Sequence, residues 1–136
     1  MNERVCDRID LAETLPATAQ AIYDTWLSSE GHTAMTGADA DLDASEGGQH
    51  SAWDGYIEGT FVALEPERRI VMTWRTSEFA PDAPDSQVEV VLEDTNAGCV
   101  VTLVHTELPE GDGPRYEQGW RDYYFTPMRA YFAGAR

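Results

Sequence analysis

The sequence predicts an α+β fold in which an antiparallel sheet of about six or seven strands packs against one long C-terminal helix. Polar and apolar residues alternate along several stretches bounded by turn residues, which is typical of half-buried strands. Most of these stretches follow one another directly, and strands joined by short turns pair antiparallel. The last stretch carries aromatic residues at helical spacing, and it has a suitable length to cover the apolar face of the sheet.

Residues 4–14 form a mixed polar and apolar stretch that we expect to be the first strand, with two short helices after it. Apolar residues at positions i, i+3, i+4 and i+7 mark one face of the first helix: Ala19, Ile22, Tyr23 and Trp26. Thr14 is the expected N-cap of this helix, and Pro16 would lie in its first turn. Gly37 is expected to close the second helix.

Three aspartates alternate in the segment "ADADLDASEGG", residues 38–48, and resemble the start of a calcium-binding loop. The sixth position of that loop needs glycine and holds Ala44, and the twelfth needs a bidentate glutamate and holds His50. The aspartates recur at every second residue, which instead predicts a strand whose carboxylates face water.

Five further strands are expected, over residues 49–55, 56–65, 69–76, 87–94 and 99–108. The stretch Glu65–Arg68 predicts a turn, and "TNAG" at 95–98 predicts a tight hairpin turn. Alternation places one set of side chains on the inner face of the sheet: Ile70, Met72, Trp74, Val88, Val90, Leu92, Val101, Leu103 and His105.

The final helix is expected over residues 115–133. Its aromatic stripe follows steps of four and three residues: Tyr116, Trp120, Tyr124, Met128 and Tyr131. Pro127 lies inside this stretch, so we expect a kink or break beside it. A curved sheet that grips such a helix leaves a cavity between the two elements.

The composition fits one globular domain, residues 1–136, with a strongly acidic balance. The net charge of −16 comes from 25 acidic and nine basic residues, and all nine bases are arginine. Such a field repels nucleic-acid phosphates and anionic lipids, so we expect neither nucleic acid nor membrane as a partner. We interpret the acidity as halophilic, because a salt-rich cytoplasm screens carboxylates; the alternative is an ordinary acidic protein from an arginine-favouring genome.

The location of the protein is expected to be cytoplasmic. No apolar stretch reaches the length of about 18 residues that a membrane-spanning helix needs. The first ten residues, "MNERVCDRID", are charged and lack the apolar run of a secretion signal. Cys6 and Cys99 lack CxxC spacing, and in such a chain we expect both thiols to be free and buried.

Two segments carry a resemblance to a known family. The stretch "GGQHSAWDGYIEGTFVALEPERRIVMTWR" (47–75) and the stretch "GWRDYYFTPMRAYF" (119–132) resemble the C-terminal domain of the activator of the heat-shock protein 90 ATPase and its single-domain bacterial homologues. These proteins belong to the START-like, or SRPBCC, superfamily, and the resemblance covers about Val5 to Phe132. It implies the helix-grip fold over residues 1–136.

The resemblance also carries expectations about pairing and function. In the helix-grip fold the first and last strands pair antiparallel, which would place Cys6 far from Cys99 and supports free thiols. Many single-domain relatives hold apolar small molecules in the cavity, and some are enzymes. The eukaryotic co-chaperone has a separate N-terminal domain that provides its main grip on the chaperone, and we expect these 136 residues to hold no such domain.

We predict a non-enzymatic protein that binds a small apolar or aromatic ligand between the sheet and the C-terminal helix. The candidate ligand-binding residues are Trp53, Met72, Trp74, His105, Trp120 and Tyr124. Taken singly, each of them is more simply explained by packing of the core; as a set that faces one helix they indicate a cavity. A stress-related co-chaperone or protein-interaction module is the alternative, and an exposed apolar patch on the outer sheet face or the helix edge would favour it. The oligomeric state is left open.

Catalytic residues, cofactors and metal sites are not predicted. His105 is the one histidine expected on the inner face, and without an acid or base beside it a core histidine is the simpler interpretation. His32 and His50 are too weak a signal for a metal site. Arg75 and Arg121 are expected near the cavity mouth, where each would bind a carboxylate ligand or, more simply, pair with one of the 25 acids. Hydrolase or cyclase chemistry ranks last.

Overall fold

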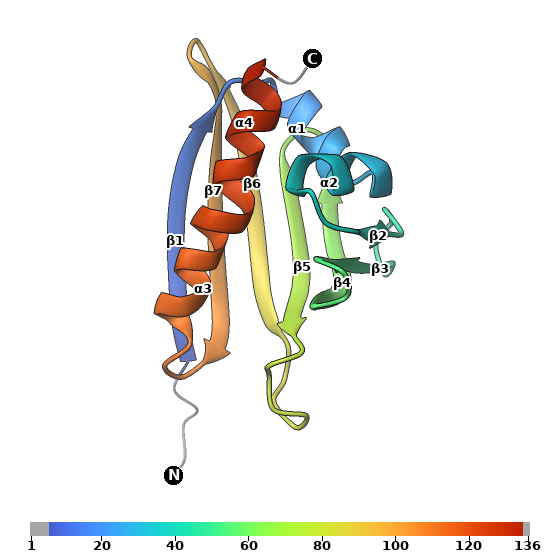
Figure 1. Ribbon diagram of the computed structural model, residues 1–136, viewed down its shortest axis with the longest axis vertical. Helices are drawn as coiled ribbons and strands as arrows, with labels where there is room; N and C mark the ends of the chain where they lie inside the picture. The colour runs from blue at the N-terminus through green and yellow to red at the C-terminus, as the bar shows by residue number, and fades with distance from the viewer. Residues whose placement is uncertain (1–5, 135–136) are drawn as a thin grey trace.

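The computed structural model describes residues 6–134 and confirms an antiparallel seven-stranded sheet (Figure 1). The strand order is β1-β7-β6-β5-β4-β3-β2, so the first strand pairs with the last and each later strand pairs with its sequence neighbours. The strands are β1 Cys6–Leu15, β2 Asp41–Leu42, β3 Gln49–Ala52, β4 Ile57–Glu65, β5 Arg69–Thr76, β6 Ser86–Thr95 and β7 Gly98–Pro109.

The helices lie together in front of the sheet in Figure 1. The long C-terminal helix consists of α3 (Gly113–Trp120), a π-helical turn, η1 (Arg121–Phe125), and α4 (Thr126–Gly134). It runs across β1, β7 and β6, while α1 (Ala19–Trp26) and α2 (Ser29–Thr36) lie beside its C-terminal half (Figure 1). Among residues 6–134, no helix has the length and apolar character that crossing a membrane requires.

The start of α1 differs from the sequence prediction. Thr14 is not the N-cap, because β1 continues to Leu15, which pairs with Cys99 of β7. Thr18 caps the helix instead, and its hydroxyl accepts a hydrogen bond from the backbone N–H of Ala21 at 3.1 Å. Pro16 therefore lies ahead of the helix. The predicted end of α2 is confirmed, since Gly37 adopts the left-handed conformation with φ 87°.

The acidic segment forms much less strand than its alternation predicted. Only Asp41 and Leu42 pair with β3, and residues 43–48 form a loop. The N–H of Asp43 still donates to the carbonyl of Gln49 across the ladder, but beyond it the N–H of Gly48 donates to the carbonyl of Ser45, so a local turn ends the ladder. The strand expected at 49–55 ends at Ala52 for a similar reason, because a turn begins at Trp53.

The kink or break predicted at Pro127 is absent, and the irregularity of the C-terminal helix lies before this residue. The N–H of Thr126 donates to the carbonyl of Arg121, five residues back, which is the hydrogen bond of a π-helix. The helix continues through Pro127 without a break (Figure 1). A proline removes one backbone donor, and here the ladder has already shifted register one turn earlier.

The core lies between the sheet and the C-terminal helix, as the sequence predicted. Trp120 and Tyr124 are buried, and the Trp120 ring lies 5.7 Å from the Trp74 ring on β5. Cys6 pairs in register with Pro109, at the opposite end of β7 from Cys99, and both cysteines are free. Cys99 is buried as predicted, but Cys6 is only partly buried, because it begins the edge strand β1.

Gly59 on β4 is a position at which the sheet requires glycine. It pairs with His50 on β3, whose Nε2–H donates to the carbonyl of Thr73 on β5 at 2.8 Å. A Cβ atom on Gly59 would lie 1.9 Å from that carbonyl oxygen and 2.6 Å from His50 Nε2. The Thr73 carbonyl and the His50 ring therefore occupy the space that a side chain at this position would need.

We predict that Gly59→Ala destabilises the protein by about 2–3 kcal/mol, because the backbone of β5 or the His50 hydrogen bond must move. Urea unfolding followed by tryptophan fluorescence measures this. Gly134→Ala is the control, because nothing lies within 4 Å of its added Cβ, and it should change stability by less than about 0.5 kcal/mol. Equal effects of the two substitutions would show that the His50 ring does not restrict this position.

Candidate functional site

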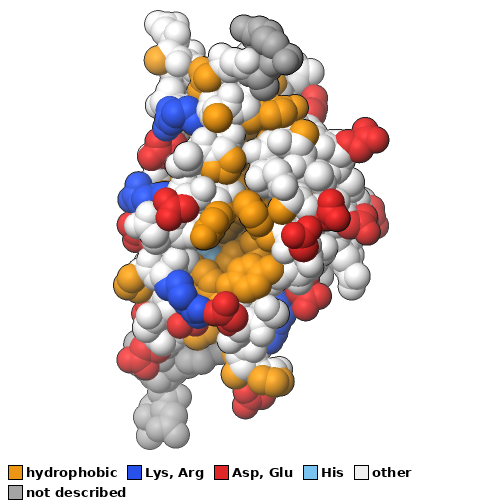
Figure 2. Space-filling view, in the orientation of Figure 1, with side chains coloured by type: hydrophobic (Ala, Val, Ile, Leu, Met, Phe, Trp, Pro, Cys, Tyr) orange, Lys and Arg blue, Asp and Glu red, His pale blue; other side chains and the backbone are white. Residues whose placement is uncertain are grey.

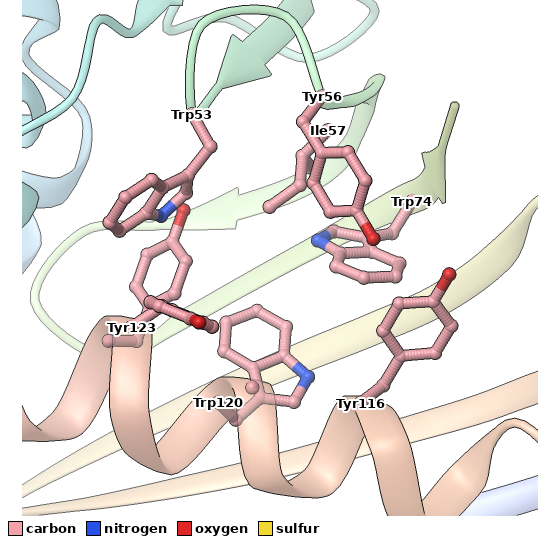
Figure 3. Close-up of a pocket in the computed structure, with 9 residues that line it drawn as sticks. Trp53, Tyr56, Ile57, Trp74, Tyr116, Trp120 and Tyr123 are labelled. Atoms are coloured by element: carbon pink, nitrogen blue, oxygen red, sulfur yellow. The ribbon is translucent and has the colours of Figure 1, made fainter. Parts of the chain in front are cut away.

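An aromatic pocket opens between the C-terminal helix and the β3–β4 end of the sheet. Its volume is about 340 Å³, within the range of roughly 300–1,000 Å³ typical of small-molecule sites. Figure 3 shows rings from the β3–β4 turn, from β5 and from the helix turned toward one space. The lining residues are Trp53, Tyr56, Ile57, Trp74, Tyr116, Gly119, Trp120, Tyr123 and Tyr124.

Four of the six residues predicted from the sequence lie on this wall: Trp53, Trp74, Trp120 and Tyr124. The other two, Met72 and His105, lie behind it. Met72 is buried beside a void of only about 10 Å³, and His105 is fully buried next to the rings of Trp74 and Trp120.

Sequence reasoning missed several lining residues. Tyr116 was already on the predicted helix stripe, so its place on the wall was available from the spacing. Tyr123 lies off that stripe, next to Tyr124, and Tyr56 lies in the turn before β4. Their positions depend on the π turn and on the turn at Trp53, which hydrophobic spacing does not encode.

A directed chain of hydrogen bonds fixes Trp120 to the sheet. The indole Nε1–H of Trp120 donates to Nδ1 of His105 at 3.0 Å, so the ring proton of neutral His105 is on Nε2. That N–H donates to Ser86 Oγ at 2.8 Å, and the Ser86 hydroxyl donates to the carbonyl of Trp74 at 2.6 Å. Each donor in the chain meets one acceptor, which leaves His105 as a fully satisfied core residue.

A second chain fixes Tyr124 to the two N-terminal helices. The Tyr124 hydroxyl lies 2.8 Å from His32 Nε2, and His32 Nδ1 lies 2.9 Å from the carbonyl of Trp26. A carbonyl only accepts, so His32 carries its proton on Nδ1 and the tyrosine hydroxyl donates to Nε2. The rings of Trp26, His32 and Tyr124 also pack within 5.5 Å of one another.

Burial keeps these groups uncharged. It lowers the pKa of His105 to about 3 and that of His32 to about 4, and it also lowers the pKa of His50. Burial raises the pKa of Tyr124 well above its ordinary value. A proton on His105 Nδ1 would displace the hydrogen bond from Trp120, whose indole N–H can only donate, so that chain requires the neutral form of His105.

The turn that carries Trp53 has an unusual backbone. Trp53 and Asp54 have φ of 55° and 59°, and Gly55 has φ of 89°. A left-handed conformation at a non-glycine residue costs about 1–3 kcal/mol and persists only where its surroundings enforce it. Here the N–H of Asp39 donates to Asp54 Oδ1 and the N–H of Asp54 donates to the Asp39 carbonyl, both at 3.0 Å.

Trp53 also holds a buried donor without an acceptor. Within residues 6–134, its indole Nε1 is the one buried side-chain nitrogen or oxygen that lacks a hydrogen-bond partner. Such groups are rare in folded proteins, because an unmatched buried donor costs about 1–3 kcal/mol. Figure 3 shows the nitrogen-bearing edge of this indole turned toward the helix side of the pocket.

The charged residues lie outside the aromatic wall. Arg75 pairs with Asp85 at 3.0 Å and also donates to two backbone carbonyls, and Arg121 pairs with Glu117 at 3.2 Å. The simpler prediction, in which both arginines pair with protein carboxylates, is thus the observed arrangement. Among residues 6–134, no group of three or more histidine, cysteine, aspartate or glutamate side chains could hold a metal ion.

The pocket mouth is also where apolar side chains gather on this face of the molecule. Figure 2 shows them around a hollow at its centre, with carboxylates and arginines spread around it. In the described part of the chain, the exposed large hydrophobic residues are Tyr123 at the mouth, 56% exposed, and Val62 on β4, 49% exposed. Val62 is the extra residue at a register shift between Phe61 and Ala63.

Comparisons with known proteins identify the family. The family described as "Activator of Hsp90 ATPase homolog 1-like protein" matches residues 16–133, and the chain belongs to it. The human "Activator of 90 kDa heat shock protein ATPase homolog 1" is 32% identical over 130 residues, which is 95% of this chain and 38% of that protein. The chain thus spans well under half the length of this relative.

Solved structures support the fold. An HSP90 activator from Plasmodium falciparum superposes with a TM-score of 0.81 and 18% identity, covering 93% of this chain and 96% of that one. CalU16 from Micromonospora echinospora superposes with a TM-score of 0.77 and 20% identity, covering 98% and 84%. At these identities the similarity shows the fold alone, which is the predicted helix-grip arrangement.

We predict that Tyr124→Phe lowers the free energy of unfolding by about 1–3 kcal/mol, because it leaves His32 Nε2 buried without a donor. Tyr123→Phe is a matched control on the adjacent, exposed residue and should change stability by less than about 0.5 kcal/mol. Urea denaturation of both variants measures the difference. Equal stabilities would argue that the Tyr124–His32 hydrogen bond contributes nothing.

The lowered histidine pKa values predict a pH dependence of stability. Below the ordinary pKa of about 6.5 the unfolded chain binds protons on His32 and His105 that the folded protein does not, so stability should fall as the pH drops from about 6.5 toward 4. Ring resonances in NMR spectra of the folded protein check this directly, and those of both residues should stay constant from about pH 8 to about pH 5. A midpoint near 6.5 would contradict the assigned hydrogen bonds of His105, and for His32 it would contradict the burial that lowers its pKa.

Proposed function

We propose that this domain binds a small apolar or aromatic ligand in the pocket between the C-terminal helix and the sheet. The observation that carries the proposal is an open space of about 340 Å³ whose wall is almost entirely aromatic. Flat rings stack on such side chains or pack edge-on against them, and each pair contributes about 0.5–1.5 kcal/mol beyond the burial of apolar area. The family resemblance points the same way.

The fixed geometry of the wall supports binding. The chains through His105 and His32 hold the Trp120 and Tyr124 rings in place before any ligand enters. A wall that is already ordered loses little side-chain entropy on binding, which favours affinity.

The same two chains favour binding over catalysis. Both ring nitrogens of His105 and both of His32 are engaged in hydrogen bonds inside the core. A general base must reach the proton that it removes from a substrate, and these rings point their nitrogens at protein atoms. We therefore propose a non-enzymatic role for this pocket.

Gly119 offers a direct test of the proposal. It lies on the pocket wall, and a Cβ atom there would have only the Tyr123 ring nearby, at 3.9 Å. We predict that Gly119→Leu fills the pocket, abolishes binding of the neutral fluorescent probe N-phenyl-1-naphthylamine, and leaves the protein folded, since leucine is favoured over glycine within a helix by about 0.5–1 kcal/mol. Probe fluorescence and thermal unfolding measure the two effects.

Gly134→Leu is the matched control for this substitution. It places the same side chain at the end of α4, away from the pocket, and should bind the probe as the parent protein does. Unchanged probe binding by Gly119→Leu, or no binding by the parent protein, would reject the pocket as the ligand site. Native mass spectrometry of freshly purified protein would show whether a small molecule is already bound.

A role as a partner of an Hsp90-type chaperone is the second candidate, and the family membership favours it. Relatives are named as activators of that ATPase, and the human one is 32% identical to this chain. The apolar surface available to such a partner is the pocket mouth around Tyr123 on the helix edge. Val62 lies elsewhere, on β4, so the two residues provide separate tests of the helix edge and the sheet.

We predict that the cognate Hsp90 captures this protein at physiological salt and that Tyr123→Glu weakens capture more than Val62→Glu does, because the former places a charge in the aromatic mouth. Pull-down with purified proteins measures both. No capture of the parent protein would dismiss the candidate, and a larger effect of Val62→Glu would place the contact on the sheet instead.

A further inference from the structure

The unmatched indole donor of Trp53 indicates which polar group the ligand presents, which the apolar wall alone does not. Three polar atoms on the wall are engaged inside the protein: Trp120 Nε1 with His105, the Tyr124 hydroxyl with His32, and the Tyr116 hydroxyl with Thr76 at 2.7 Å. Trp53 Nε1 is buried and has no partner among residues 6–134. This inference rests on the proposed function, because it concerns a ligand in the same pocket.

The backbone holds this donor in place. Trp53 adopts its left-handed conformation in a turn fixed by the paired hydrogen bonds between Asp39 and Asp54. The indole of Trp74, on β5, turns its nitrogen toward the same space (Figure 3). The Trp74 nitrogen faces the pocket, whereas Trp53 Nε1 is itself buried. A ligand oxygen reaches Trp53 Nε1 only when a neighbouring ring, such as the half-exposed Tyr123 packed 5.3 Å from it, turns aside.

We propose that the ligand is an uncharged, flat compound of about two fused rings that presents a carbonyl or ether oxygen to Trp53 Nε1. The size follows from the volume: a dry cavity of roughly 150 Å³ holds benzene, and this pocket has about 340 Å³. An acceptor oxygen relieves the unmatched donor, which a hydrocarbon leaves buried and unpaired.

The charges of the protein restrict the chemical class of the ligand further. No arginine lies on the pocket wall, and the net charge of −16 repels anions. Cations bind best over the negative faces of aromatic rings, whereas the N–H edges of Trp53 and Trp74 carry the positive end of the indole. A neutral acceptor matches both constraints.

The test uses a matched pair of probes, 1-tetralone and tetralin, which differ by one carbonyl group in place of a methylene. The four tryptophan indole N–H resonances in a ¹⁵N correlation spectrum report binding. We expect 1-tetralone to bind roughly 5- to 100-fold more tightly than tetralin and to shift the Trp53 resonance as a hydrogen bond forms.

Trp53→Phe identifies the donor. It removes the N–H and keeps an aromatic ring, so the preference for 1-tetralone should fall to within about twofold while tetralin binds nearly as before. The retained tetralin affinity shows that the variant pocket is intact; an unfolded variant would bind neither probe, and the parent protein's preference and Trp53 shift would then decide.

The outcomes separate the two proposals. Equal affinity of the parent protein for both probes, or a preference that survives Trp53→Phe, would overturn the acceptor inference and leave ligand binding in place. Failure of both probes to bind the parent protein would overturn the acceptor inference and also argue against ligand binding. Tighter binding of tetramethylammonium than of 1-tetralone would overturn the uncharged class.

Discussion

The C-terminal helix can bury its aromatic stripe only if the polar atoms on those rings find partners inside the protein, and two histidines meet this requirement for Trp120 and Tyr124. His105 accepts from Trp120 and passes the chain through Ser86 to a carbonyl on β5, while His32 accepts from Tyr124 and donates to the end of α1. Successive turns of one helix are thereby joined to the sheet and to the N-terminal helices. Because a buried neutral imidazole has one donor and one acceptor, each chain has a single direction.

The pocket stays open because of the residues that lie beside the Trp120 and Tyr124 rings. Gly119 contributes no side chain on the helix wall, and the strained turn at Trp53 holds the opposite wall away from it. Backbone strain of this kind is retained where the surrounding structure enforces it, and such positions concentrate at functional sites. A close-packed core would have filled this volume, since protein interiors leave few voids larger than a water molecule.

The sequence predicted the sheet and the helix stripe because both have a hydrophobic period, and Trp74, Trp120 and Tyr124 were identified as inward-facing by that period alone. The loop, the π turn and the histidine hydrogen bonds leave no periodic hydrophobic pattern in the sequence. The acidic segment alternates like a strand but forms a loop through local turns, and the π turn changes the angular position of Tyr123 relative to Tyr124. The direction of the histidine hydrogen bonds depends on long-range neighbours, so sequence spacing identified His105 as a core residue without revealing what it supports.

The helix and the sheet enclose an aromatic space, and we propose that a small ring compound occupies it. A crystal structure of the protein grown with 1-tetralone tests it most directly. We predict that the ring system lies between Trp53, Trp74 and Trp120, with its oxygen within hydrogen-bond distance of Trp53 Nε1. A structure from the same crystals in which Trp53 and Tyr123 close onto Trp120 and fill the space, with the compound absent, would contradict it.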